Sequence, residues 1–202
     1  IIVGTHKYAA IVLENITRVQ NNRDQLERYA GKLGYALALA VEDVLAGLVD
    51  DFSNSVGTQA VELTDDDILR ARQYLDDADA PQDSRVMVVS PMQETGLLKL
   101  DRFGHNDYEA VHGPGRETGL EKAYVYSFMG MPIYRSVNVE GANSTGHDNG
   151  MFQKEALALV MQIAPKTYHQ FDIDYIVDKV VVEQLYGTQE MRDDHGVFMK
   201  GA

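Results

Sequence analysis

Apolar side chains recur at three- and four-residue steps between Arg23 and Phe52, a spacing that predicts one long amphipathic helix. About thirty residues at a rise of ~1.5 Å each would give a helix about 45 Å long, well beyond the usual ~12 residues of a globular helix. Because glycine weakens a helix by up to ~1 kcal/mol relative to alanine, its three glycines indicate a close backbone neighbour or a bend. The glycines are Gly31, Gly34 and Gly47, and the apolar stripe consists of Leu26, Tyr29, Ala30, Leu33, Leu37, Ala40, Val41, Val44, Leu45 and Leu48.

The segments at both ends of the chain have the composition of β-strands. Residues 1–19 are rich in Ile, Val, Thr and Tyr and predict one or two extended segments broken near Gly4. From Lys166 onwards the chain is again expected to be extended, and it contains the β-branched run 180–182. The expected turning points are Gly187 and a final hairpin around Asp194 and Gly196.

A second helix is predicted after Thr64. Thr64 can cap this helix, and Asp65, Asp66 and Asp67 fall in its first turn, where the helix dipole favours anions. Pro81 marks its end. The three acids are therefore explained by helix electrostatics better than by a metal site.

A short strand that leads directly into a helix is predicted at residues 85–100. The run 85–89 is β-branched and reads as a buried strand. Ser90 caps the helix, Pro91 takes its first position, and Gln93 completes a Ser-x-x-Gln capping box. Because the Gly-x-Ser-x-Gly context of a nucleophile elbow is missing, we interpret Ser90 as a structural cap.

The region between residues 104 and 163 predicts loops, strands and one further helix. Residues 104–122 and 140–150 are polar and glycine-rich, typical of mobile loops. Two strands are expected around Gly130, and Pro132 indicates an edge strand or a strand start. The spacing of apolar positions in residues 151–163 favours a helix; those positions are Phe152, Ala156, Leu157 and Val160.

The composition excludes several classes of protein. The 202-residue chain is 45% hydrophobic, enough to form a core, and its formal net charge of −13 argues against a broad basic surface for nucleic acid or for an anionic membrane. It has no cysteine, which excludes disulfides, a thiol nucleophile and cysteine-ligated zinc. Its longest apolar run, near residues 35–41, is shorter than the ~20 residues that span a bilayer.

No set of residues can be assigned a catalytic, cofactor-binding or metal-binding role from the sequence. None of the histidines is paired at helical spacing, and a metal site would require His105, His112 and His147 to converge from separate loops. Residues 112–119 lack the spacing of a phosphate-binding loop. The alternating pair Asp172 and Asp174 also fits one face of an ordinary half-buried strand. We therefore expect no catalytic residue, cofactor or metal ligand.

The order of these elements resembles the major capsid proteins of tailed bacteriophages, with the Hong Kong 97-type fold. The stretch "HKYAAIVLENITRVQNNRDQLERYAGKLGYALALAVEDVLAGL" is similar to that family's incoming strand and spine helix, and "DDILRARQYLDDADAPQDSRVMVVSPMQETGLLKL" to the opening of its axial domain. The segments "SFMGMPIYRSVNV", "FQKEALALVMQ" and "DYIVDKVVVEQLYGTQEMRDDHGVFM" resemble its strand pair, following helix and closing strands.

The resemblance implies an α+β fold with a long spine helix, a peripheral domain and an axial domain. Residues 1–57 would form the peripheral-domain strand and spine helix, 58–165 the axial domain, and 166–202 the closing strands that return through both. The resemblance also implies that the family's N-terminal arm and most of its extended loop are absent from this sequence. Residues 85–100 would then be a structural part of the axial domain.

The function implied by the resemblance is structural. Copies of the chain would form a homo-oligomer of pentamers and hexamers, an icosahedral shell that encloses a phage genome without sequence-specific DNA binding. Scaffolding, portal and decoration proteins are the further partners that the family implies, with no membrane partner. The shell would assemble in the host cytoplasm and become the capsid of the virion. The flexible loops 104–119 and 140–150 would line the ring centre or help the subunit fit both kinds of ring.

Two alternatives remain open at this point. An encapsulin, a bacterial nanocompartment that holds cargo, shares the shell fold, so the residues separate it poorly from a capsid. An α/β enzyme is the alternative from another class, with a site built from the 104–119 and 140–150 loops. The enzyme hypothesis predicts a pocket with convergent polar groups, whereas the shell hypothesis predicts large contacts along the long helix and the loops.

Overall fold

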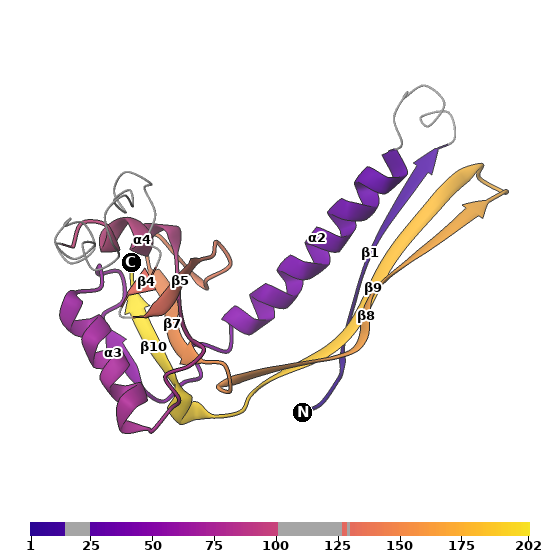
Figure 1. The fold of residues 1–202 in the computed structure, drawn as a ribbon. Coiled ribbons are helices and arrows are strands. Elements are labelled where there is room, and N and C mark those ends of the chain that lie inside the picture. Colours follow the sequence, from indigo (N-terminus) through magenta and orange to yellow (C-terminus); the bar gives the residue numbers. More distant parts are fainter. Residues whose placement is uncertain (15–24, 101–126, 129) are drawn as a thin grey trace, which may run out of the picture. The chain divides into compact units, whose positions relative to one another are not determined.

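The computed structural model describes residues 1–14, 25–100, 127–128 and 130–202, and it divides into two compact units (Figure 1). Unit 1 consists of residues 1–44 and 159–189, and unit 2 of residues 45–158 and 190–202. The chain therefore runs from unit 1 into unit 2, back into unit 1, and into unit 2 again for its last residues. These units divide at 44/45, 158/159 and 189/190, whereas the sequence led us to expect divisions at 57/58 and 165/166.

Unit 1 combines a three-stranded sheet with the long helix. The sheet has the order β1 (Thr5–Glu14), β9 (Val177–Glu190) and β8 (Leu157–Asp172), and the helix is α2 (Gln25–Ala46). Strands β1 and β9 are antiparallel, with Thr5 opposite Tyr186 and Glu14 opposite Val177. The extended segments predicted at both ends of the chain are thus confirmed over 5–14, 166–172 and 177–190, while 15–19 lie outside the described residues.

Helix α2 is a single unbroken helix of 22 residues, as predicted, but it ends earlier than expected. After Ala46 the backbone turns, with Leu48 N–H donating to Leu45 O at 3.3 Å. The later apolar positions belong to unit 2, where Val49 and Phe52 form a small core cluster with Ala156. At Gly31 and Gly34 an added Cβ would meet no described atom within 4 Å, so the expected close backbone neighbour is not found there.

Unit 2 is built on a seven-stranded sheet. The strand order is β2 (Ser55–Gly57), β10 (Gly196–Gly201), β7 (Gly146–Gln153), β3 (Arg85–Val89), β5 (Met131–Arg135) and β4 (Ser127–Phe128), and β6 (Gly141–Ala142) pairs with β7. Pairs β10–β2 and β3–β5 are parallel, and the others are antiparallel. The predicted strands at 85–89 and around Gly130 are confirmed, and Pro132 lies near the start of β5.

Within the described part of unit 2, two helices accompany this sheet: α3 (Asp65–Asp77) and α4 (Pro91–Leu97). The Thr64 cap of α3 is confirmed, because its side chain accepts from Asp67 N and the Asp67 side chain accepts from Thr64 N. The core of unit 2 contains fully buried side chains from α3 and the central strands. It consists of Val56, Leu63, Ile68, Ala71, Leu75, Ala80, Met87, Val89, Leu97, Met131, Ile133, Met151, Val197 and Met199.

The helix predicted over residues 151–163 is wrong, and the loop predicted over 140–150 is instead the hairpin of β6 and β7, with an exposed turn at residues 143–145. Residues 146–153 form β7, the strand between β10 and β3, and β8 begins at Leu157. Met151 is fully buried opposite both Met87 and Val197. The apolar spacing resembled a helix, but burial between two partner strands decided the conformation.

Two predicted turning points near the C-terminus are also wrong. Gly187 lies inside β9, where a Cβ would approach the Ile2 carbonyl oxygen to 2.3 Å, so glycine serves a close backbone contact. No hairpin forms around Asp194 and Gly196. Asp193–His195 is a short 3-10 turn, and the following strand β10 pairs with β2 and β7.

Candidate functional site: the surfaces of the two units

One face of the sheet in unit 1 carries a network centred on Glu183. On β9 the even-numbered side chains from 178 to 186 are buried, whereas the odd-numbered ones from 179 to 185 are half-buried on the opposite face. There Glu183 accepts a hydrogen bond from the Tyr168 hydroxyl at 2.8 Å and lies 3.2 Å from His6 Nε2. These hydrogen bonds, from Tyr168 first and His6 second, hold the pKa of Glu183 below its ordinary value.

The same face carries a second ion pair near the β8–β9 turn. Lys179 Nζ binds Asp172, which lowers the pKa of Asp172 and raises that of Lys179. Asp172 Oδ1 also accepts from the Asp174 backbone N–H at 3.0 Å. Asp174 lies in the turn after β8, so the two acids predicted to share a strand face instead form a turn that is closed by Lys179.

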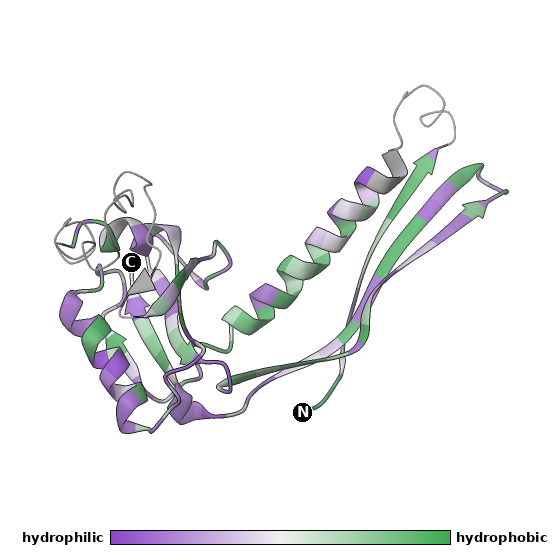
Figure 2. Cartoon of the chain, viewed as in Figure 1, coloured by the Kyte–Doolittle hydropathy of each residue, from purple (hydrophilic) through white to green (hydrophobic). Residues whose placement is uncertain are grey.

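The opposite face of the sheet is covered by α2. Gln184 Nε2 donates to Leu37 O at 3.0 Å, and the Tyr186 hydroxyl donates to Ala40 O at 3.2 Å. Figure 2 shows hydrophobic positions that recur along α2 and β9. Burial raises the pKa of the Tyr186 hydroxyl above its ordinary value, which already leaves the group protonated and a hydrogen-bond donor at neutral pH. One face of the sheet is thus occupied, and the Glu183 face is open among the described residues.

Unit 2 has a hollow of about 460 Å³ between β2 and α3. It is open to solvent and contains one exposed cation, Arg70, with Tyr74 and Val61 as apolar walls. Asp67 is already engaged in the capping box, and Glu62 pairs with Lys99. The hollow therefore lacks the convergent, buried polar groups that an enzyme site requires.

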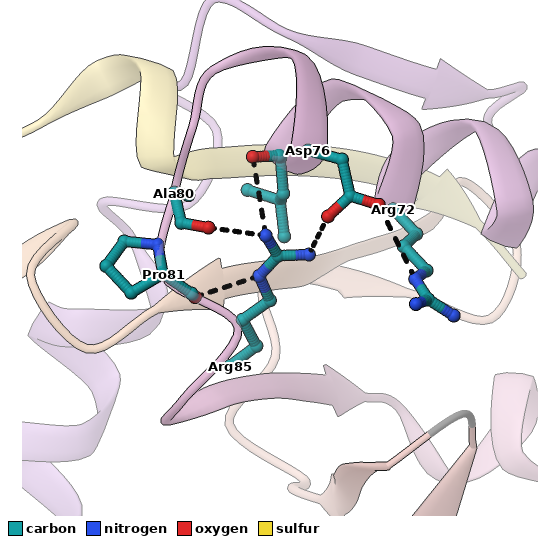
Figure 3. Close-up of polar contacts among 6 residues, drawn as sticks. Arg72, Asp76, Ala80, Pro81 and Arg85 are labelled. Atoms are coloured by element: carbon teal, nitrogen blue, oxygen red, sulfur yellow. Dashed lines mark hydrogen bonds and ion pairs between the residues drawn. The ribbon is translucent and has the colours of Figure 1, made fainter.

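The strand at 85–89 is anchored to the end of α3 by Arg85 (Figure 3). Its guanidinium is almost fully buried and donates to Asp76 Oδ1 at 2.5 Å, Ala80 O at 2.5 Å and Pro81 O at 3.0 Å. Arg72 also approaches Asp76, at 3.7 Å. Arg85 thus binds both the last turn of α3 and the loop that follows it, which is a structural role.

Ser90 is the N-cap of α4, as predicted, and it has a second partner that the sequence did not indicate. Its Oγ accepts from Gln93 N at 3.0 Å and donates to Ala202 O at 2.9 Å. Gln93 does not complete the expected capping box. Its Oε1 accepts from Leu63 N and Ala202 N instead, at 3.2 and 3.1 Å. Ser90 is fully buried in this network, which argues for structure and against a nucleophile.

The remaining candidate residues do not converge on a site within the described part of the chain. His147 Nε2 lies 3.0 Å from Asn143 Oδ1, whereas His105, His112 and the 104–119 segment lie outside the described residues. Among the residues that the structure describes, no group of three or more His, Cys, Asp or Glu is arranged to hold a metal ion. In that same part of the chain, no helix is both long and apolar enough to cross a membrane.

Comparison with known proteins supports the resemblance to phage capsid proteins. The sequence model of a family described as "Phage capsid protein" matches residues 4–197. A protein chain of Mycobacterium phage Che8 superposes with a TM-score of 0.80 at 22% identity, covering 98% of this chain and 71% of that one. The cyanophage P-SCSP1u capsid gives a TM-score of 0.77 at 14% identity, covering 99% and 73%.

An encapsulin complex is also similar in structure. The SrpI encapsulin complex of Synechococcus elongatus gives a TM-score of 0.72 at 11% identity, covering 98% of this chain and 74% of that one. No curated protein matches the chain. The structural neighbours share less than 25% identity with the chain, so they establish its fold, while the family match covers almost the whole sequence.

Proposed function

The chain belongs to the phage capsid protein family and is a shell-forming capsid protein, and from this premise we propose that its copies form the pentamers and hexamers of an icosahedral shell around a phage genome. The observation that carries the proposal is the family match over residues 4–197. A closed shell requires many individually weak contacts between identical subunits, which sum to a stable assembly.

We assign the two units of this fold to the two domains that the family resemblance implies. Unit 1, with α2 as the spine helix, is the peripheral domain, and unit 2, with its seven-stranded sheet, is the axial domain. This assignment is supported by the unbroken α2 and by the return of residues 190–202 into unit 2. The role proposed for the loops now excludes residues 146–150, because these belong to the core strand β7.

Packaged DNA is the proposed content of the shell, held without sequence-specific contacts. The formal net charge of −13 supports this, because phosphate binding depends on clustered lysine and arginine. An acidic inner wall would let the genome enter and leave without becoming trapped. The protein is a virion component, and we propose that it assembles in the host cytoplasm with scaffolding and portal proteins and carries decoration proteins afterwards.

The test is electron microscopy of the full-length gene product, produced alone and together with the products of neighbouring genes. We expect uniform closed shells or tubes. A small monodisperse protein under all of these conditions would contradict the shell function. Neighbouring portal and terminase genes are expected for a capsid.

An encapsulin-like nanocompartment is the second candidate, and it is favoured by the TM-score of 0.72 with the SrpI encapsulin complex. The two candidates differ in content: a nanocompartment holds a protein cargo encoded by a neighbouring gene, and a capsid holds DNA. Purified shells that contain a protein cargo in place of DNA would favour the nanocompartment. For the enzyme alternative, the described part of the proposed site is 140–150, and its residues 146–150 belong to the core strand β7.

A further inference from the structure

The turn between β8 and β9 exposes an unusual amount of apolar surface. We call residues 171–176 the hairpin tip. Phe171, Ile173, Tyr175 and Ile176 are 46%, 78%, 76% and 59% exposed, although all four are large and apolar. Soluble proteins rarely gather such side chains at one exposed turn unless the surface binds a partner.

The hairpin tip is held in one conformation by its own polar groups. Asp172 accepts from the Asp174 backbone N–H and binds Lys179, and Lys179 Nζ also lies 5.8 Å from the centre of the Tyr175 ring. Ile176 has a backbone φ of +55°, a conformation that β-branched residues rarely adopt. A turn that is strained and cross-linked in this way is preorganised, which lowers the conformational entropy lost on binding.

The charge of the hairpin tip restricts what it can bind. Asp172 is neutralised by Lys179, whereas the exposed Asp174 carboxylate forms no ion pair with any described residue. On a chain with 31 acidic and 18 basic residues, most surfaces of another copy would repel this carboxylate. A receiving surface on a second copy must therefore provide both a free cation and apolar contacts.

The first half of α2 provides both a free cation and apolar contacts on its outer side. Arg28, Lys32 and Tyr35 are exposed there, at helical spacing on one side, and Tyr35 is 67% exposed. Lys32 Nζ lies 5.5 Å from the centre of the Tyr29 ring and forms no ion pair with a described carboxylate. Gly31 lies between them with no described atom within 4 Å of an added Cβ, which leaves room for an apolar side chain.

We propose that the hairpin tip of one copy docks on the first half of α2 of a second copy, with Asp174 facing Lys32 and the apolar tip residues packed around Gly31 and Tyr35. This proposal rests on the proposed shell function, because it names a contact between the copies that form the shell. Aromatic residues at a well-packed interface centre, such as Tyr175 and Tyr35 would be here, are typical of energetically dominant interface positions.

Site-directed cross-linking tests the contact directly, because the chain contains no cysteine. Full-length Asp174→Cys and Lys32→Cys proteins are mixed at high concentration and treated with a short bis-maleimide cross-linker. We expect covalent dimers in the mixture only, since each protein carries a single thiol and the cross-linker spans the gap between the Cβ atoms of an Asp–Lys pair, which is too wide for a disulfide. Arg70→Cys, on an exposed position of α3, replaces Lys32→Cys as the matched control and should give none. No dimer in the mixture, or an equal yield from Asp174→Cys alone, would overturn the proposal.

Charge reversal gives an independent measurement. Asp174→Lys and Lys32→Glu are each expected to lower the yield of assembled shells about tenfold, and the double variant should recover to within about threefold of the original. Asp66→Lys and Arg70→Glu are matched controls on α3 and should assemble normally. If the unaltered protein forms shells but shows no cross-link and no rescue, only this contact is refuted. If the cysteine variants cross-link but the unaltered protein never forms closed shells, the proposed shell function is refuted and the contact between copies is retained.

Discussion

The Gln184 side-chain amide donates a hydrogen bond to the main-chain carbonyl oxygen of Leu37 over 3.0 Å and so joins the central strand β9 to α2. Gln184 is fully buried, and its Oε1 has no hydrogen-bond partner among the described residues. A buried acceptor without a partner costs about 1–3 kcal/mol, which offsets what the amide donor contributes. The polar side chain of Gln184 therefore adds no net stability to the fold.

Replacing Gln184 with leucine should leave stability unchanged or raise it by up to ~1 kcal/mol. The substitution conserves volume and removes the buried acceptor, while Leu37 O keeps its place in the helix hydrogen-bond ladder. Gln184→Ala should lower the free energy of unfolding by about 2–3 kcal/mol, because it leaves a cavity. Urea denaturation followed by circular dichroism compares the two. A leucine variant that is as unstable as the alanine variant would show that the hydrogen bond dominates.

Two glycines in different surroundings should respond oppositely to alanine. At Gly34, inside α2, an added Cβ meets no described atom within 4 Å, so Gly34→Ala should stabilise the protein by about 0.5–1 kcal/mol. At Gly196 the same Cβ would lie 2.3 Å from Phe52 Cε1, so Gly196→Ala should destabilise by about 1–3 kcal/mol. Thermal unfolding of both variants measures the difference, and equal effects would show that the packing around Phe52 adjusts freely.

Local sequence signals predicted the elements whose stability is local. The period of α2, the Thr64 cap and the strand at 85–89 were all confirmed, because helical spacing, capping residues and β-branched runs act over a few residues. The resemblance to phage capsid proteins depended on the order of such elements, and the family match confirms it.

Elements whose conformation depends on residues far away in the sequence were predicted poorly. Strand β7 was mistaken for a loop and a helix because its conformation depends on Met87 and Val197, which lie far before it and far after it in the sequence. Gly187 was interpreted as a turn because sequence cannot show the approach of Ile2. The Glu183 network was missed for the same reason, although the alternation along 177–186 could have indicated a half-buried polar face.

Removing the Ser90 hydroxyl should destabilise unit 2. Ser90→Ala leaves the Gln93 N–H and the Ala202 carbonyl without partners in a fully buried network. Loss of an N-cap costs ~1 kcal/mol, and the second lost bond brings the expected total to about 2 kcal/mol. Ser144→Ala, at an exposed position, is the control and should change stability by less than about 0.5 kcal/mol. Hydrogen exchange at residues 196–202 would report the loosening, and unchanged protection would contradict the role given to Ser90.

The hydrogen bond from Tyr168 should make stability depend on pH through Glu183. Because Tyr168 is the largest cause of the lowered pKa of Glu183, Tyr168→Phe should raise that pKa towards its ordinary value of 4.5. A carboxyl whose pKa is lowered by folding contributes stability above its unfolded pKa and loses it as the pH falls through the folded value. The stability difference between the original protein and Tyr168→Phe should therefore be largest above about pH 4.5 and shrink in more acidic solution.

Carbon-detected NMR titration of the Glu183 carboxyl, with melting temperatures between about pH 3 and about pH 7, measures both effects. Tyr8→Phe is the control, because Tyr8 lies opposite Glu183 in the sheet register, is 69% exposed and stacks near His6 without bonding Glu183. It should leave the titration unchanged. A pKa of Glu183 that does not move in Tyr168→Phe would mean that His6, the second cause, holds the carboxylate by itself, and His6→Gln should then move it.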